Sequence, residues 1–352
     1  MVKSVDNREA DSVSLTHNIH GGKGAVYACW GRIHTYERIA GAEPELRMDS
    51  RSISVIIPTL NAERYLKPLL TRLMDQTLTP EIIIVDSCSD DNTENIAKTF
   101  PVTFVSIRRR DFSHGSARNY AAGLASRQMI AFLTQDALPT DSHLLENLIE
   151  PLTRPEIAAS YGRQIASESA APPEQFLRRF NYPEKAMVKG KENIPLLGIK
   201  TFFFSNVCSA VRRKEFEKLG GFDSETLMNE DMLYAAKLIL HGYKTAYVPQ
   251  ATVLHEHDFT LRQVFGRYFD IGVSVNGTFK SLDEVNIHSE GVKFFRQEIQ
   301  FFRETKRRRW IPYAFVEALC KFLGFNVGEY HHVIPNFVKR KISRHKNYWP
   351  KE

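Results

Sequence analysis

Four short apolar segments alternate with helical segments between residues 53 and 133, and this alternation limits the fold more than any other feature. Strands are expected at 53–57, 81–85, 102–107 and 129–133, where β-branched and other apolar residues gather. Helices are expected between them, at 62–75, from residue 94, and at 114–125. Strands separated by helices of this length predict a parallel, doubly wound α/β sheet.

Polar side chains stand where three of these strands end. Thr59 and Asn61 close the first strand, Asp86 follows the second, and Asp136 follows the fourth. Open α/β sheets bind ligands at the carboxyl ends of their strands. A carboxylate there can accept hydrogen bonds from a nucleoside, and another can bind Mg²⁺ or Mn²⁺. The plainer alternative is that Asp86 caps a helix and Asp136 begins a turn before Pro139.

The residues at these strand ends resemble a known family. Segments 56–61 (Ile-Ile-Pro-Thr-Leu-Asn) and 85–93 (Val-Asp-Ser-Cys-Ser-Asp-Asp-Asn-Thr) are similar to the opening of inverting family 2 glycosyltransferases. Segments 112–119 and 132–137 resemble the rhamnosyltransferase branch of that family. The similarity covers about residues 52–350. It implies a GT-A-type nucleotide-binding domain with a mainly parallel sheet, followed by a C-terminal helical region.

The resemblance also implies a nucleotide-sugar site. Asp86 would bind the pyrimidine, Arg118 would lie near the nucleotide-sugar, and Asp136 matches the second acid of the Asp-x-Asp metal motif. Thr134 stands in place of the first acid, so this motif offers a metal one carboxylate. The implied nucleotide-sugar residues are Pro58, Thr59, Asn61, Glu63, Asp86, Arg118, Gln135 and Asp136.

An acidic pair, Glu230 and Asp231, begins a predicted helix that ends near His241. Acids in a first helical turn often serve only as partners of the helix dipole. In the family this pair supplies the base, and Asp231 matches it. An inverting displacement needs one carboxylate that takes the proton of the acceptor hydroxyl. Glu230 would orient a partner or be structural.

Two histidines, His255 and His257, are spaced so that they point the same way on an extended strand. The resemblance places a metal-binding histidine at His255, with His257 as the alternative or supporting ligand. Together with Asp136, they would hold a divalent cation, Mg²⁺ or Mn²⁺. A lone histidine is more often structural than a ligand.

The middle of the chain is expected to hold a loop with a short helix at 165–200 and then an apolar strand at 202–206. The aromatic run in that strand favours a place in the core over a platform for a sugar.

Residues 301–352 carry 12 Lys and Arg against 4 Asp and Glu, so the positive charge of the chain is concentrated there. Helices are expected at 261–271, 294–310 and 311–325. Basic residues beside aromatic ones are typical of a helix at a lipid interface. A solvated helical cap is the alternative. The pattern predicts docking on a membrane surface, and no recognised nucleic-acid motif accompanies it, so no nucleic acid is expected as a partner.

Composition and terminal features set the remaining expectations. Hydrophobic residues make up 43% of the chain and charged residues 25%, which excludes wholesale disorder. No CxxC spacing, secretory signal or spanning apolar segment is present, which favours a cytoplasmic protein, peripheral at the inner face of the cell membrane. The expected domains are a partly disordered extension (1–50), the GT-A domain (51–260) and a basic amphipathic helical region (261–352).

The resulting hypothesis is an inverting glycosyltransferase that moves L-rhamnose from dTDP-L-rhamnose onto a saccharide or lipid-linked saccharide acceptor. The product would belong to an O-antigen-like cell-surface polysaccharide. Only the resemblance favours rhamnose, since no spacing of residues distinguishes one hexose from another. The alternatives are a non-catalytic nucleotide-sugar-binding scaffold and an enzyme that transfers another hexose from a UDP-sugar.

Overall fold

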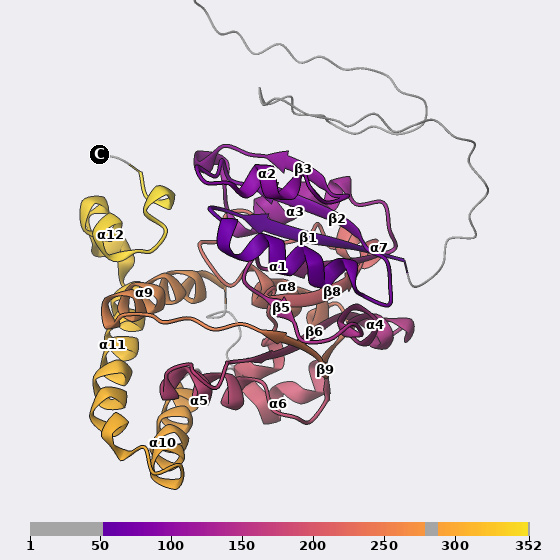
Figure 1. Cartoon of the computed structure of the whole chain (residues 1–352). Coiled ribbons are helices and arrows are strands. Elements are labelled where there is room, and N and C mark those ends of the chain that lie inside the picture. The colour runs from indigo at the N-terminus through magenta and orange to yellow at the C-terminus, as the bar shows by residue number, and fades with distance from the viewer. Residues whose placement is uncertain (1–51, 279–287, 351–352) are drawn as a thin grey trace, which may run out of the picture. The chain divides into compact units, whose positions relative to one another are not determined.

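The computed structural model describes residues 52–278 and 288–350, so the expected extension at 1–50 lies outside the described residues. Within them the strands form a nine-stranded mixed sheet in the order β3-β2-β1-β4-β8-β6-β9-β5, with β7 paired to β9 (Figure 1). The four strands expected from the sequence alternation are present and pair in parallel. They are β1 (Ile53–Thr59), β2 (Glu81–Asp86), β3 (Thr103–Ser106) and β4 (Met129–Leu133).

Both faces of this parallel half are covered by helices. Successive residues of a strand point to opposite sides of a sheet, so β1 serves two cores. Val55 and Ile57 pack with α1 (Glu63–Met74), while Ile56 packs on the other face with α3 (His114–Leu124). The expected doubly wound arrangement is therefore confirmed for this half of the sheet.

The second half of the sheet mixes strand directions. β8 (Cys208–Arg212) runs antiparallel to both β4 and β6 (Ile157–Ile165), and β6 then pairs in parallel with β9 (Lys244–Leu254). The short strands β5 (Leu138–Pro139) and β7 (Met187–Lys189) run antiparallel to β9. This pairing places the ends of β4, β6 and β9 at one edge, where the candidate site forms.

Helices follow the strands and continue to the C-terminus. The other α-helices of the described residues are α2 (Thr93–Ala97), α4 (Leu144–Ile149), α5 (Pro172–Asn181), α6 (Ile194–Leu197), α7 (Arg213–Lys218), α8 (Glu230–Leu240), α9 (Leu261–Thr278), α10 (His288–Glu304), α11 (Ile311–Glu329) and α12 (Asn336–Ile342). None of them is long and apolar enough to cross a membrane. The short 3₁₀ turns of the same region are η1 (Arg109–Asp111), η2 (Glu150–Thr153), η3 (Lys191–Asn193), η4 (Gly198–Phe202), η5 (Arg308–Trp310), η6 (His331–Val333) and η7 (Lys346–Tyr348).

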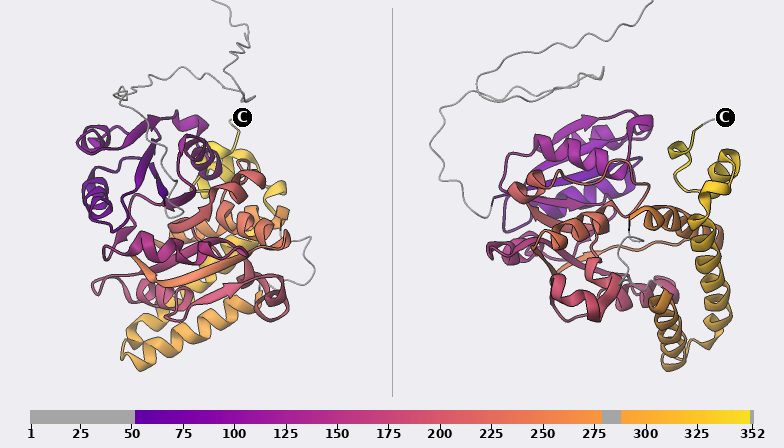
Figure 2. Two further views of the ribbon diagram at one scale, coloured as in Figure 1. Left: turned by 90° about the vertical axis from the view of Figure 1, so that its right-hand side faces the viewer. Right: turned by 180° about the vertical axis from the view of Figure 1, so that it is seen from behind.

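Glycines allow α9 and α11 to approach until their backbones touch. A Cβ on Gly272 would lie 2.2 Å from the carbonyl oxygen of Phe325, and one on Gly328 would lie 2.2 Å from that of Phe269. Real Cβ atoms do not come this close, so these positions admit no larger residue without movement of the helices. Figure 2 shows α9 and α11 with α10 as the orange-to-yellow part of the chain.

Two sequence expectations about secondary structure are wrong. The segment expected as a strand at 202–206 is the end of η4 followed by a loop. The reason is that the buried Nζ of Lys189 donates hydrogen bonds to the backbone carbonyl oxygens of Lys200 and Phe203. Its apolar character reflects burial on several sides rather than in a sheet. The helix expected at 294–310 ends at Glu304, since Lys306 adopts a left-handed backbone with φ of 58° that breaks the helix.

Candidate active site

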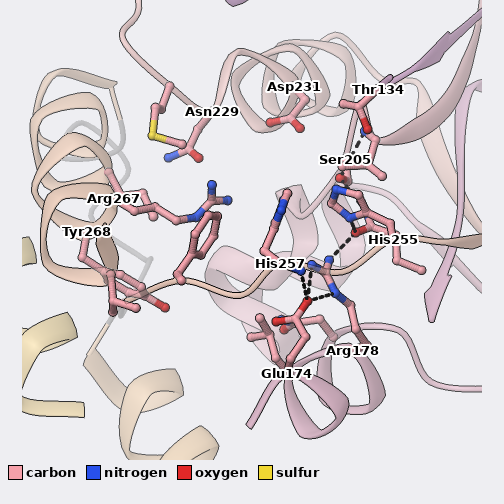
Figure 3. Close-up of a pocket in the computed structure, with 18 of the residues that line it drawn as sticks. Thr134, Glu174, Arg178, Ser205, Asn229, Asp231, His255, His257, Arg267 and Tyr268 are labelled. Carbon is pink, nitrogen blue, oxygen red and sulfur yellow. Dashed lines mark hydrogen bonds and ion pairs between the residues drawn. The ribbon is translucent and has the colours of Figure 1, made fainter. Parts of the chain in front are cut away.

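A cavity of about 730 Å³ lies where the strand ends meet α8 and the C-terminal helices (Figure 3). The strand ends contribute Thr134, Asp136, Gln164, His255 and His257 to its wall. The start of α8 contributes an acidic pair, and α5 contributes Glu174 and Arg178. The region after residue 260 supplies Val264, Arg267, Tyr268, Ile271, Trp310, Tyr313, Glu317, Lys321, Arg344 and His345.

One carboxylate and two imidazoles gather on the strand-end wall. Nε2 of His255 lies 3.4 Å from Oδ1 of Asp136, and Nδ1 of His257 lies 4.0 Å from Oδ2 of the same carboxylate. One ligand atom from each residue fits within 4.8 Å of the others. β9 ends at Leu254, so the histidines follow the strand instead of lying on it, but His255 N still donates to Ile165 O at 2.9 Å and keeps the register. The three expected metal residues therefore lie together.

Hydrogen bonds fix which nitrogen of His255 faces the carboxylate. Gln164, which is 1% exposed, directs its carbonyl Oε1 toward His255 Nδ1 at 3.0 Å. The same Oε1 accepts a hydrogen bond from Arg178, which has no acceptor atom and so fixes the orientation of the amide. Nδ1 of His255 must then be the donor, so in the neutral ring the lone pair of Nε2 faces Asp136. Two acceptors that face each other across 3.4 Å suit a cation between them.

The charge states of the three residues agree with this donor set. Burial lowers the pKa of His255 despite the opposing effect of Asp136. Burial and the neighbouring His255 lower the pKa of His257 to about 3. Burial alone would raise the pKa of Asp136, but its neighbours His255, Thr134 and His257 hold it below its ordinary value. Two neutral imidazoles and one carboxylate are a ligand set that divalent transition metals accept.

The acidic pair is held at the first turn of α8. Asn229 adopts a left-handed backbone with φ of 63° and turns the chain into the helix. Asp231, half-buried and lining the cavity, accepts hydrogen bonds from the backbone N–H of Asn206 at 3.0 Å and of Met232 at 2.7 Å. Glu230 is 5% exposed and pairs with the buried Arg118 at 3.2 Å. Glu230 thus faces the protein interior, whereas Asp231 is available to a ligand.

The two acids of the pair have opposite pKa shifts. Burial and the negative charge of Glu230 raise the pKa of Asp231 to about 7. Burial also tends to raise the pKa of Glu230, but Arg118 and the amide of Asn206 hold it below its ordinary value. An acid whose pKa is near neutral pH is suited to proton transfer, since both of its forms are accessible there.

The expected nucleotide residues form a second group at the ends of β1 and β2. Asp86, 3% exposed, accepts hydrogen bonds from Thr59 Oγ1 at 2.8 Å, from Ser89 N at 2.8 Å and from Ser89 Oγ at 2.6 Å. Gln135 exchanges two hydrogen bonds with the backbone of Leu60, at 2.9 and 3.2 Å, and so ties the loop after β1 to the loop after β4.

Asn61 and Glu63 extend this group to the loop after β2. Asn61 Oδ1 accepts from Asp90 N at 2.9 Å, and Glu63 Oε2 accepts from Asn92 N at 3.3 Å. Asn61 has a left-handed φ of 51°, which aims its side chain at that loop. Of the expected site residues, the cavity wall includes Arg118, Asp136, Glu230, Asp231, His255 and His257. It does not include Pro58, Thr59, Asn61, Glu63, Asp86 or Gln135.

The sequence patterns assigned no role to several residues that the structure places in or beside the cavity. Gln164 and Arg178 orient His255, and Glu174 Oε1 accepts from Arg178 Nε at 2.8 Å and from His257 N at 3.1 Å. Asn206 links the two acids, since its backbone N–H bonds Asp231 and its side-chain amide bonds Glu230 at 3.2 Å. No periodic pattern marks these residues, because each acts through one contact with a residue far away in the sequence.

The sequence is similar to known proteins over most of its length. Residues 54–220 match the profile of glycosyl transferase family 2. The chain is 40% identical to the O-antigen chain rhamnosyltransferase RfbN of Salmonella typhimurium (strain LT2), over 84% of this chain and 96% of that protein. It is 39% identical to the O-antigen chain rhamnosyltransferase WbaN of Salmonella anatum, over 85% and 96%.

A solved structure has the same fold. The mannosyltransferase PcManGT from Pyrobaculum calidifontis, in complex with GDP-Man and Mn²⁺, aligns with a TM-score of 0.50 at 18% identity, covering 80% of this chain and 75% of that one. This likeness confirms the predicted GT-A-type α/β fold. The family profile and the sequence relatives establish that the chain is a glycosyltransferase and belongs to glycosyl transferase family 2.

Proposed function

We propose that the enzyme is an inverting rhamnosyltransferase that moves L-rhamnose from dTDP-L-rhamnose onto a saccharide acceptor during synthesis of an O-antigen-like polysaccharide. The observation that carries this proposal is the 40% identity to an O-antigen chain rhamnosyltransferase over 96% of that relative's length. The similarity to this relative spans 84% of the chain, whereas the family profile matches residues 54–220.

Asp231 is the base in this proposal. Its carboxylate lines the cavity and is anchored by two backbone N–H groups, so its orientation is fixed before the acceptor binds. It takes the proton of the acceptor hydroxyl as that oxygen attacks the anomeric carbon. Its negative charge also stabilises the positive charge that develops on the sugar ring in the transition state. Glu230 is a positioning residue, because it pairs with Arg118 and Asn206 at the base of the same turn.

The strand-end group binds the nucleotide. Asp86 would accept a hydrogen bond from the pyrimidine, and Thr59 and Ser89 hold its carboxylate in place. Gln135 fixes the loop of Pro58, Leu60 and Asn61 beside the loop that carries Asp136. In this proposal the nucleoside would lie next to the cavity, and the sugar would extend toward Asp231.

Asp136, His255 and His257 would hold a divalent cation, Mg²⁺ or Mn²⁺. When bound, the cation would neutralise the negative charge of the departing diphosphate. Gln164 keeps the Nε2 lone pair of His255 directed at this position, and Glu174 holds the backbone of His257. The set compensates for Thr134, which cannot supply the second carboxylate of an Asp-x-Asp motif.

A membrane surface is the proposed location of the acceptor, with the enzyme on the cytoplasmic face. The exposed side of α11 supports this, because Phe315, Leu319 and Phe322 are 57%, 55% and 59% exposed and share one face at helical spacing. Exposed Lys306, Arg308 and Arg309 precede this helix and suit anionic lipid headgroups. When the three apolar residues are replaced by Ser, the protein should no longer float with anionic vesicles. Unchanged flotation of this variant would contradict membrane docking through α11.

A panel of nucleotide sugars tests the proposed donor. Purified enzyme with Mn²⁺ is incubated with dTDP-L-rhamnose, UDP-glucose, UDP-N-acetylglucosamine and GDP-mannose, each with a lipid-linked saccharide acceptor. We expect transfer and nucleotide release from dTDP-L-rhamnose above all others. Preferred turnover of a UDP-hexose would overturn the rhamnose assignment, and binding of a nucleotide sugar without any turnover would favour a scaffold.

A further inference from the structure

Two arginines from the C-terminal region face the cavity around one aromatic ring. The guanidinium of Arg344 lies 4.4 Å from the ring centre of Phe259, and that of Arg267 lies 5.9 Å from the same centre. All three residues line the cavity. Figure 3 shows Arg267 reaching from α9 into the space below Asp231, opposite His257. Neither arginine has a role in the mechanism proposed above.

The chain is built to bring Arg344 beside α9. A Cβ on Gly266 would lie 2.6 Å from the carbonyl oxygen of Ile342, so the segment before Arg344 touches the helix backbone. Asp270, fully buried on the same helix, accepts a hydrogen bond from the backbone N–H of Arg344 at 2.9 Å. Burial raises the pKa of Asp270 to about 6, in spite of this bond and the two guanidinium charges nearby. The position of Arg344 is therefore specified by contacts on both sides.

Within residues 52–278 and 288–350, no carboxylate oxygen lies within 4.0 Å of either guanidinium. The cavity carboxylates have other partners: Asp231 is bound by backbone N–H groups and Asp136 lies beside the imidazoles. Two like charges beside one ring repel each other, and the repulsion is larger where water is partly excluded. An anion in the cavity would relieve this repulsion.

We propose that Arg267 and Arg344 bind a diphosphate group in the cavity. The planar fork of an arginine matches phosphate oxygens with two parallel hydrogen bonds, which favours a phosphate over a neutral sugar hydroxyl. A diphosphate has enough oxygens to engage both arginines. The inference rests on the proposed use of a nucleoside diphosphate sugar. The diphosphate has two possible sources, the donor and a lipid diphosphate that carries the acceptor.

Binding measurements on the full chain test this inference and separate the two sources. Calorimetric titrations with dTDP, dTMP and farnesyl diphosphate are compared for the wild type and for the variants Arg267→Met and Arg344→Met. Arg262→Met is the matched control, because Arg262 is an exposed arginine on the same helix that does not line the cavity. Arg344 is exposed, so its replacement leaves the packed core intact.

If the donor supplies the diphosphate, both variants lose about tenfold or more in affinity for dTDP, as expected for lost charge-assisted hydrogen bonds, and keep their affinity for dTMP within about twofold. If the acceptor supplies it, dTDP binding is unchanged and farnesyl diphosphate binding falls by a similar factor. If the two variants bind both dTDP and farnesyl diphosphate as tightly as the wild type does, the inference is overturned. A wild-type enzyme that binds no nucleoside diphosphate would instead contradict the proposed function, and the titration of the unmodified chain shows this separately.

Discussion

Nε2 of His255 lies 3.4 Å from Oδ1 of Asp136, at the meeting point of two strand ends that are far apart in the sequence. Nδ1 of the same ring faces Oε1 of Gln164, which accepts its hydrogen bond, so Nε2, the nitrogen that faces Asp136, carries a lone pair. The contact is therefore better suited to a shared cation than to a direct hydrogen bond. This relationship leads to the first two predictions.

The His255→Ala variant should lose Mn²⁺ binding, because it removes one of the three side chains that would hold the cation. We expect the loss to exceed the roughly 10- to 100-fold that is typical when an outer-shell partner is removed. Electron paramagnetic resonance of free Mn²⁺ in a titration measures it. His143→Ala is the control, since His143 is exposed and pairs with Glu146 away from the cavity. Equal Mn²⁺ affinity in the two variants would argue against the metal site.

The Gln164→Leu variant tests the orientation of His255 without removing a proposed ligand. The substitution removes the acceptor that holds Nδ1, so the ring can turn or change its tautomer. We expect Mn²⁺ affinity to fall by about 10- to 100-fold. Arg178 keeps its ion pair with Glu174 at 2.6 Å, which limits the damage to the fold. The same thermal midpoint and Mn²⁺ affinity as the wild type would show that Gln164 does not position the histidine.

The pH dependence of the reaction reports on Asp231. Its carboxylate must be ionised to accept a proton, and its pKa is raised to about 7 by burial and by Glu230. We therefore expect kcat/KM to fall by about tenfold per pH unit below that value and to level off above it. A rate that rises as the pH falls from 7 to 5 is incompatible with Asp231 as a base.

Glu230→Gln should move the midpoint of this profile to lower pH. The substitution removes the negative charge that raises the pKa of Asp231, and it leaves the positive charge of Arg118, which lowers that pKa. Glu225→Gln serves as the control because Glu225 is exposed. The comparison uses the pH profile of kcat/KM for the two variants. A midpoint that stays in place or rises in Glu230→Gln would mean that the acids do not interact as proposed.

The crossing of α9 and α11 should not tolerate a methyl group. In Gly328→Ala the new Cβ would meet the backbone of Phe269, so the helices must separate, and we expect a loss of about 1–3 kcal/mol in the free energy of unfolding. Gly291→Ala is the matched control, since it lies in α10 with no atom within 4 Å of its Cβ. There, alanine should stabilise the helix by up to about 1 kcal/mol. Urea unfolding measures both, and equal free energies would contradict the close contact.

The parallel half of the fold was predictable because its signals are local. β-branched runs at β1, β2 and β4, separated by helices, leave few other arrangements. Asp86 and Asp136 were identified from their positions at strand ends, and resemblance to the family then implied their roles and the metal role of His255. The structure places Asp136, His255 and His257 together. Their roles stay predictions, as does the domain boundary at residue 260.

Other parts of the site could not be read from the sequence. The apolar run at 202–206 looked like a strand because periodicity does not reveal that a buried lysine, Lys189, binds the carbonyl groups of that segment. Gln164 and Arg344 each depend on a partner brought close by the tertiary fold, so no local pattern identifies them. Burial of a single polar side chain has no periodic signal.

The anomeric configuration of the product tests the central claim most directly. Wild-type enzyme is incubated with dTDP-L-rhamnose and a saccharide acceptor, and nuclear magnetic resonance of the product determines the configuration at the new linkage. A single base at Asp231 predicts a linkage of configuration opposite to that of the donor, and Asp231→Asn should abolish its formation while dTDP still binds within a few-fold. A product of retained configuration, or near-normal turnover by Asp231→Asn, would contradict the account.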